Sequence, residues 1–139
     1  MLKLNLGCGP VQPEGWINVD YSLGARLSGI PFYNFTNKRL KLFDIDAEGL
    51  PRVWDDKMYI HNLNKRFPWE NCSVDVIYCS HTLEHFSKHE GLEFLRECHR
   101  VLKKDGIIRI VVPDLKSFVE EYQKGNMRAD EFVEKLGVL

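Results

Sequence analysis

Two glycines and one acid in the first twenty residues have the types and spacing of a ligand site. Lys3–Leu6 is a short apolar segment with the alternation of a strand, and Gly7 and Gly9 follow it. Glycine permits unusual backbone angles and lets a ligand lie against bare main chain. A second apolar segment ends at Asp20, whose carboxylate can accept two hydrogen bonds from a diol. This order predicts a nucleoside site at the carboxyl ends of the strands of an open α/β sheet.

The same stretch limits the kind of nucleoside. A dinucleotide fingerprint needs a third glycine, where this chain has Gln12, and an acid further along than Asp20. Pro10 and Pro13 oppose a long helix directly after the turn, and the P-loop pattern is absent. A nucleoside without phosphates fits better. The alternative is that Gly7 and Gly9 only form a tight turn.

A second group of candidate residues follows the most apolar segment. Val74–Ser80 has the near-continuous apolar character of a parallel strand buried on both faces. The next residues match H-x-x-E-H, in which His81 and His85 on one helix could share a zinc ion, with Glu84 as general base. A catalytic zinc needs a third protein ligand, and the motif directly follows a strand, so we expect no metal here. The two histidines are candidates for substrate contact or for helix capping and packing.

The remaining patterns supply the elements that position these residues. We expect a third strand at 57–63, a fifth at 106–112 and a helix that Ser87 and Glu90 begin with a capping box and that ends near residue 102. Lys103 and Lys104 suit its carboxyl end, and a turn at 105–106 follows. Asp114 can cap a helix that runs to residue 124, and residues 127–139 could form another helix. Residues 21–56 show no sustained hydrophobic periodicity. Within them we expect only a short helix near 22–28 and a short strand near 40–43. That stretch is either a lid or an aromatic patch on the sheet.

Bulk composition excludes several classes of protein. The chain has 139 residues, 44% of them hydrophobic, and a net charge of −1, as expected of a single globular domain without a general affinity for nucleic acid. We expect no membrane span and a cytoplasmic location. The four cysteines form no C-x-x-C pair and are expected to be reduced thiols.

The G-C-G turn, the acid at the end of the second strand, the E-H pair and the later R-V-L-K-K-D-G run resemble, in order, the class I S-adenosylmethionine-dependent methyltransferases. The resemblance covers residues 1–20 and 57–124. It implies S-adenosylmethionine as cofactor, with Asp20 on the ribose and His81 or His85 as the residue that removes a proton from the acceptor. Asn5 departs from the family, which has an acid there. The other cofactor-binding residues that it implies are Asn5, Gly7, Cys8, Gly9, Asn62, Leu63 and Ser80, with Asn62 and Leu63 beside the adenine and Ser80 on the sulfonium side.

The resemblance also implies the architecture and the reaction. We expect one domain over residues 1–139, a Rossmann-like α/β fold with a mostly parallel sheet of about five strands and flanking helices. The antiparallel C-terminal hairpin of the family is missing, so the chain is either a fragment or a minimal version. An open sheet edge favours a homodimer. The expected activity is methyl transfer to a small-molecule or glycan acceptor, because the (Asn/Asp)-Pro-Pro-aromatic segment of nucleobase and glutamine methyltransferases is absent. The alternative is a non-catalytic module that binds a nucleoside or a partner.

Overall fold

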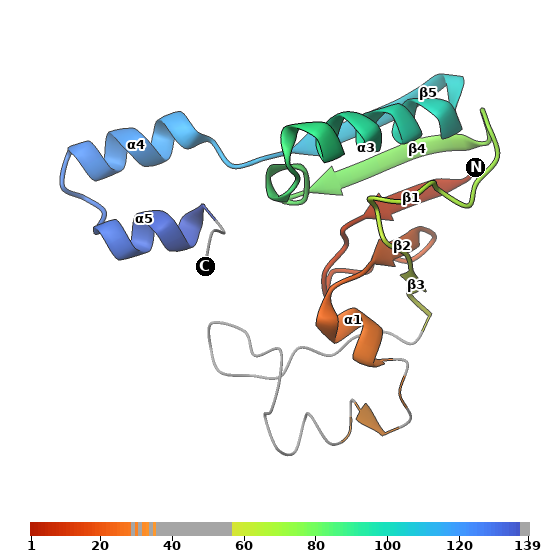
Figure 1. Ribbon diagram of the computed structural model, residues 1–139, viewed down its shortest axis with the longest axis horizontal. Helices are drawn as coiled ribbons and strands as arrows, with labels where there is room; N and C mark the ends of the chain where they lie inside the picture. The colour runs from red at the N-terminus through yellow and green to blue at the C-terminus, as the bar shows by residue number, and fades with distance from the viewer. Residues whose placement is uncertain (29, 31, 34, 36–56, 137–139) are drawn as a thin grey trace.

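The centre of the molecule is a five-stranded parallel sheet with the strand order β3-β2-β1-β4-β5 (Figure 1). The computed structural model describes residues 1–28, 30, 32, 33, 35 and 57–136. The strands are β1 (Lys3–Leu6), β2 (Ile17–Asp20), β3 (Tyr59–Ile60), β4 (Val74–Ser80) and β5 (Leu102–Val111). The predicted Rossmann-like α/β fold is confirmed. In the described part of the chain, only helices follow β5, so the hairpin of the complete family fold is not among these residues.

The strand order creates a switch point beside β1. The chain runs outward from β1 through β2 to β3, then returns to the other side of β1 for β4 and β5. In open α/β sheets, ligands bind outside the carboxyl ends of the strands where the order reverses. Because β1 and β4 are parallel neighbours, Gly7 and His81, which follow them, lie at the same edge of the sheet.

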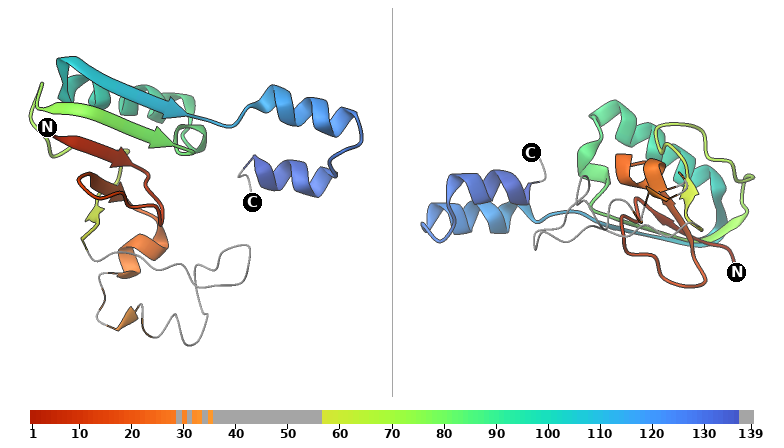
Figure 2. Two further views of the ribbon diagram at one scale, coloured as in Figure 1. Left: turned by 180° about the vertical axis from the view of Figure 1, so that it is seen from behind. Right: turned by 90° about the horizontal axis from the view of Figure 1, so that it is seen from below.

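One face of the sheet is covered by α3 (Lys88–Val101), which runs along β4 and β5 (Figure 1). Figure 2 shows that no helix of the described residues lies over the opposite face of these two strands. Near the carboxyl edge are α1 (Leu23–Ser28) and the single 3₁₀ turn η1 (Leu83–His85). The helices α4 (Leu115–Gln123) and α5 (Ala129–Lys135) form a hairpin that extends past the end of β5.

The core lies between the sheet and α3. Leu4 and Leu6 of β1 and Ile77 of β4 are fully buried, and they pack in one cluster with Phe94 and Cys98 of α3. Burial of each large side chain contributes roughly 1.5–3 kcal/mol relative to exposure. Since side chains alternate along a strand, the residues between these positions face the side that α3 leaves open.

The helix predictions are confirmed by their caps. The Ser87 hydroxyl accepts from the N–H of Glu90, whose carboxylate accepts from the N–H of Ser87, so the capping box is complete. Asp114 accepts from the N–H groups of Lys116 and Ser117 at the start of α4. The short helix predicted near 22–28 is α1, and α5 occupies part of the predicted tail helix. The strand predicted near 40–43 lies outside the described residues.

The third strand is shorter than the predicted range of 57–63. Only Tyr59 and Ile60 pair, with Val19 and Asp20 of β2. The strand is at the edge of the sheet, and β2 itself ends at Asp20, so residues after Ile60 would have no partner on β2. The N–H of His61 still donates to the carbonyl of Asp20, and the chain then turns away.

The fifth strand begins earlier than predicted. α3 ends at Val101, and Leu102 is already extended and paired with Val74. Val76 pairs with Ile107, so the predicted turn at 105–106 is an insertion within β5, opposite Asp75. The Nζ of Lys103 lies 2.7 Å from Asp75, so this side chain pairs with β4 and not with the carboxyl end of α3 as predicted.

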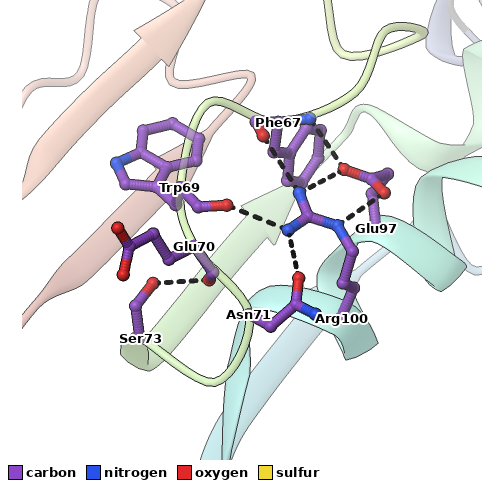
Figure 3. A network of polar contacts seen from close by, with 7 residues as sticks. All are labelled: Phe67, Trp69, Glu70, Asn71, Ser73, Glu97 and Arg100. Atoms are coloured by element: carbon purple, nitrogen blue, oxygen red, sulfur yellow. Dashed lines mark hydrogen bonds and ion pairs between the residues drawn. The ribbon is translucent and has the colours of Figure 1, made fainter.

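A charged network fastens the β3–β4 connection to α3 (Figure 3). The Arg100 guanidinium donates to the carbonyls of Phe67 and Trp69, to the Asn71 side chain and to both carboxylate oxygens of Glu97. Glu97 also accepts from the N–H of Phe67 at 2.7 Å. The described part of this connection has no helix of its own, so the network takes over the positioning that a helix would provide.

Replacing Arg100 with methionine is expected to lower the free energy of unfolding by about 2–4 kcal/mol, because half-buried acceptors on two elements lose a charged donor. The side chains of Arg100 and Glu97 are only 18% and 21% exposed, so solvent screens them weakly. Urea denaturation measures the change. A Glu93→Gln variant removes the exposed pair with Arg96 and serves as the control, with an expected change within about 0.5 kcal/mol.

The same network predicts a pH dependence of stability. The hydrogen bond from Arg100 holds the pKa of Glu97 below its ordinary value of 4.5. Because the folded pKa is the lower one, Glu97 stabilises the fold above the unfolded pKa, and this contribution is lost as the pH falls through the folded pKa. Urea denaturation between about pH 7 and pH 3 is expected to show a smaller loss in Glu97→Gln than in the unmodified chain. Equal losses would contradict the role of Glu97.

Candidate functional site

The glycine turn after β1 is tied to the end of β2. Gly7 and Gly9 have φ angles of +65° and +54°, in the region that favours glycine. The N–H groups of Gly7 and Cys8 both donate to the carbonyl of Val19, at 2.9 and 3.1 Å. The turn therefore presents main chain, with no side chain on its glycines, at the carboxyl edge of the sheet.

Gly7 also passes very close to the segment after β4. A Cβ placed on Gly7 would lie 2.0 Å from Oγ1 of Thr82, far closer than non-bonded heavy atoms can approach. A Cβ on Gly9 would meet nothing within 4 Å. Gly7 is thus required by packing as well as by backbone angle, whereas Gly9 borders open space.

Asp20 joins the two strand ends. Its Oδ2 accepts from the N–H of Gly9 at 2.9 Å, and its Oδ1 accepts from the N–H of Ser22, before α1, at 2.7 Å. The residue is buried, at 8% exposure. Each carboxylate oxygen has a further lone pair, so Asp20 can hold the glycine turn and still accept hydrogen bonds from a diol.

A cavity of about 670 Å³ opens at this edge of the sheet. Its volume lies in the range of about 300–1,000 Å³ typical of small-molecule sites. Both strand ends face it, as the sequence predicts. The predicted site residues that line it are Gly7, Gly9, Asp20, Asn62, Leu63, His81 and His85.

The other predicted residues, Asn5, Cys8 and Ser80, line a different cavity of about 860 Å³. It lies along the side of β1, β4 and β5 that α3 leaves open, and it shares Gly7, Gly9 and His81 with the first cavity. The Asn5 amide donates to the carbonyl of Val11 at 3.1 Å and to the side chain of Asn18 at 2.9 Å. Asn5 thus braces the β1–β2 connection.

Cys8 is a buried, neutral thiol. Its sulfur lies 3.6 Å from the sulfur of Met58. Burial, with a smaller effect of the Asp20 charge, raises the pKa of the Cys8 thiol to about 12. Its side chain is therefore not available as a thiolate nucleophile, and its Sγ instead lies 3.3 Å from the carbonyl oxygen of Gly9 in the glycine turn.

Asn62 offers a donor to the cavity. Its Oδ1 accepts from the N–H of Asn64 at 2.9 Å, which forms a local turn. That oxygen is thus engaged by the main chain, although it keeps a second lone pair. Within the described residues, the amide nitrogen has no partner, so Asn62 presents a donor as well as an acceptor to the cavity.

His81 has an unusual backbone. Its φ is +51°, although it is not a glycine, and its N–H donates to the carbonyl of Val111 at 3.0 Å. Its Nδ1 lies 3.3 Å from Oε1 of Glu84. The N–H of His85, after the same turn, donates to the carbonyl of Thr82.

The H-x-x-E-H pattern does not form the helix that a zinc site of this type needs. Leu83–His85 is a 3₁₀ turn, and His81 precedes it in a left-handed conformation. The two histidines therefore do not lie on successive turns of one α-helix. Across the described residues, no three His, Cys, Asp or Glu side chains are grouped to hold a metal ion.

Six further residues line the first cavity and were missed from sequence: Tyr21, Ser22, Leu23, Gly24, Thr82 and Phe86. Tyr21 and Leu23 directly follow Asp20 and are 44% and 60% exposed, which is a large apolar surface for a bound ring to cover. Their position directly after Asp20 could have identified them from the sequence. Thr82 was not recognisable, because its importance depends on its approach to Gly7.

Among the helices of the described residues, none has the length and apolar character needed to cross a bilayer.

Solved structures similar to this chain include a methyltransferase and a putative methyltransferase. A phosphoethanolamine N-methyltransferase of Haemonchus contortus, solved with phosphoethanolamine and S-adenosylhomocysteine, is 16% identical with a TM-score of 0.46. A putative S-adenosylmethionine-dependent methyltransferase of Methanococcus maripaludis is 16% identical with a TM-score of 0.47. The YcgJ protein of Bacillus subtilis is 17% identical with a TM-score of 0.49. The alignments cover 78%, 98% and 97% of this chain, respectively.

The chain spans only part of these proteins: 21% of the Haemonchus enzyme, 68% of the Methanococcus protein and 70% of YcgJ. No curated protein sequence matches it. The profile of a methyltransferase domain family matches residues 4–110, which include both strand ends and the segment after β4. The chain therefore belongs to this family of methyltransferase domains, for which S-adenosylmethionine is the methyl donor.

Proposed function

We propose that this chain transfers the methyl group of S-adenosylmethionine to a small-molecule or glycan acceptor. The observation that carries the proposal is the cavity that the Gly7–Gly9 turn and Asp20 share. Asp20 is close enough to the turn to bind its main chain, so one ligand can contact both. The sulfonium ion itself supplies an activated methyl group.

The lining residues fit the parts of that donor in order along the edge of the sheet. Asp20, at the end of β2, suits the ribose hydroxyls, and Asn62 and Leu63, after β3, suit the adenine. The bare main chain of Gly7 and Gly9 suits the methionine part. Thr82 and His81, after β4, then lie on the side of the sulfonium, which joins the ribose to the methionine part.

Methyl transfer depends mainly on alignment of the acceptor atom, the methyl carbon and the departing sulfur. The residues after β4 would provide that alignment, because they border both cavities through His81. A general base is needed only where the acceptor atom must lose a proton. His81 and His85 are the candidates, and His81 has the more defined environment.

Calorimetry on the purified chain with S-adenosylmethionine, S-adenosylhomocysteine and NAD tests the proposal. Binding of the first two without NAD is expected, because the turn lacks the third glycine of a dinucleotide site. Binding of NAD alone would contradict it. If the nucleoside binds but no small hydroxyl or amine compound or glycan is methylated, the non-catalytic binding module is the better description.

We also propose that two copies associate through the free edge of β5. β5 is the longest of the described strands, with 10 residues, and it pairs with β4 on one side only. Ile107 and Ile108 on it are 64% and 37% exposed, and a long apolar edge strand tends to pair. Light scattering is expected to give the mass of a dimer, and Ile108→Lys is expected to give a monomer. A clean monomer of the unmodified chain would contradict the proposal.

A further inference from the structure

His81 has a left-handed backbone conformation, which normally favours glycine. At φ +51° a residue with a Cβ costs roughly 1–2 kcal/mol relative to the usual helical region. Strained backbone of this kind concentrates at functional sites, where the surrounding structure holds it. The hydrogen bond from the N–H of His81 to Val111 provides part of that restraint.

Glu84 is the residue that the ring of His81 contacts. Its Oε1 lies 3.3 Å from Nδ1 of His81, and its side chain is only 18% exposed. Its other oxygen, Oε2, is buried and has no hydrogen-bond partner among the described residues. A half-satisfied buried carboxylate is costly, so its stabilising contribution to the fold is small or negative.

Together these features form a carboxylate–imidazole pair at the junction of the two cavities. We propose that Glu84 is a positioning residue that holds the proton of neutral His81 on Nδ1 and leaves Nε2 free as a base. The partner of one ring nitrogen determines which tautomer is present. The use of this tautomer in catalysis rests on the proposed function, whereas the tautomer itself can be measured in the chain without any ligand.

The pair would support removal of a proton from the acceptor during methyl transfer. The acceptor atom, an oxygen or nitrogen that carries a proton, forms a bond to the methyl carbon while the carbon–sulfur bond breaks and its electron pair remains on sulfur. The acceptor's proton passes to Nε2 of His81, and the imidazolium then releases it to water. Glu84 stabilises the imidazolium and does not itself take the proton.

The test is ¹⁵N NMR of the histidine rings in the whole chain, recorded in alkaline buffer at a pH above which the ring ¹⁵N shifts no longer change. His81 is expected to be mainly the Nδ1–H tautomer. In Glu84→Met, a replacement of similar length, it is expected to become mainly the Nε2–H tautomer that a free imidazole prefers. The control Glu93→Met exchanges an exposed glutamate of α3 and is expected to leave the His81 tautomer unchanged.

Urea denaturation of the same variants separates positioning from a purely structural role. Glu84→Met is expected to be as stable as the unmodified chain or more stable, because it removes an unsatisfied buried oxygen. An unchanged His81 tautomer in Glu84→Met would overturn the inference, whether or not that variant also loses stability. Failure of S-adenosylmethionine to bind would instead refute the proposed function, because the tautomer is measured without any ligand.

Discussion

Replacing Gly7 with alanine is expected to lower the free energy of unfolding by about 2–5 kcal/mol and to abolish cofactor binding. The added Cβ would lie 2.0 Å from Oγ1 of Thr82, and the backbone is at φ +65°. The left-handed angle costs about 1–2 kcal/mol for a residue with a side chain, and overpacking adds about 1–3 kcal/mol. Urea denaturation measures the first effect, and calorimetry with S-adenosylhomocysteine measures the second.

Gly9→Ala is the matched control. Its φ is +54°, but a Cβ there meets nothing within 4 Å, so only the backbone cost of about 1–2 kcal/mol is expected. Thr82→Ala combined with Gly7→Ala is expected to recover part of the lost stability, because Oγ1 and Cγ2 of Thr82 are the nearest obstacles. Equal effects of the two glycine substitutions, or no recovery in the double variant, would show that the approach of Thr82 to Gly7 is not the constraint.

Replacing Asp20 with asparagine is expected to weaken binding of S-adenosylhomocysteine by about ten- to a hundredfold. Hydrogen bonds from ribose hydroxyls to a charged carboxylate contribute about 1.5–3 kcal/mol, and 1.4 kcal/mol corresponds to a factor of ten. Asparagine keeps the shape of the side chain and one acceptor oxygen. It is preferable to alanine, because Asp20 also holds the N–H groups of Gly9 and Ser22, and alanine would release both.

Asp114→Asn provides the comparison for Asp20→Asn. Asp114 also accepts from two main-chain N–H groups, those of Lys116 and Ser117, although through one oxygen where Asp20 uses both, and it lines neither cavity. Calorimetry with S-adenosylhomocysteine is expected to give unchanged affinity in Asp114→Asn. Unchanged affinity in Asp20→Asn as well would remove the diol role from Asp20 and leave it as a brace for the glycine turn.

Local patterns predicted the parts of the fold that depend on local chemistry. The caps at Ser87 and Asp114 identified the starts of α3 and α4, because a cap involves only residues three positions apart or fewer. The apolar segments before Gly7 and His81 identified β1 and β4. The length of β3 was not predictable in this way, because it depends on where β2 ends.

The sequence predicted which strand ends meet at one edge, and it gave less information on which side chains line the cavity there. Gly7, Asp20 and His81 meet because parallel strands bring their carboxyl ends to one edge. Asn5 lies in the other cavity because it alternates with Leu4 and Leu6, which pack toward α3. That alternation was already visible in the sequence. The approach of Thr82 to Gly7 and the contact between Glu84 and His81 depend on three-dimensional packing after β4, which no pattern of residue types specifies.

The most direct test of the nucleoside site is a crystal structure of the chain with S-adenosylhomocysteine. We expect the ribose hydroxyls within hydrogen-bond distance of Asp20, the adenine beside Asn62 and Leu63, and the amino-acid part against the main chain of Gly7 and Gly9. Density for the ligand in the cavity lined by Asn5 and Arg109, with the space beside Asp20 free of it, would contradict this account.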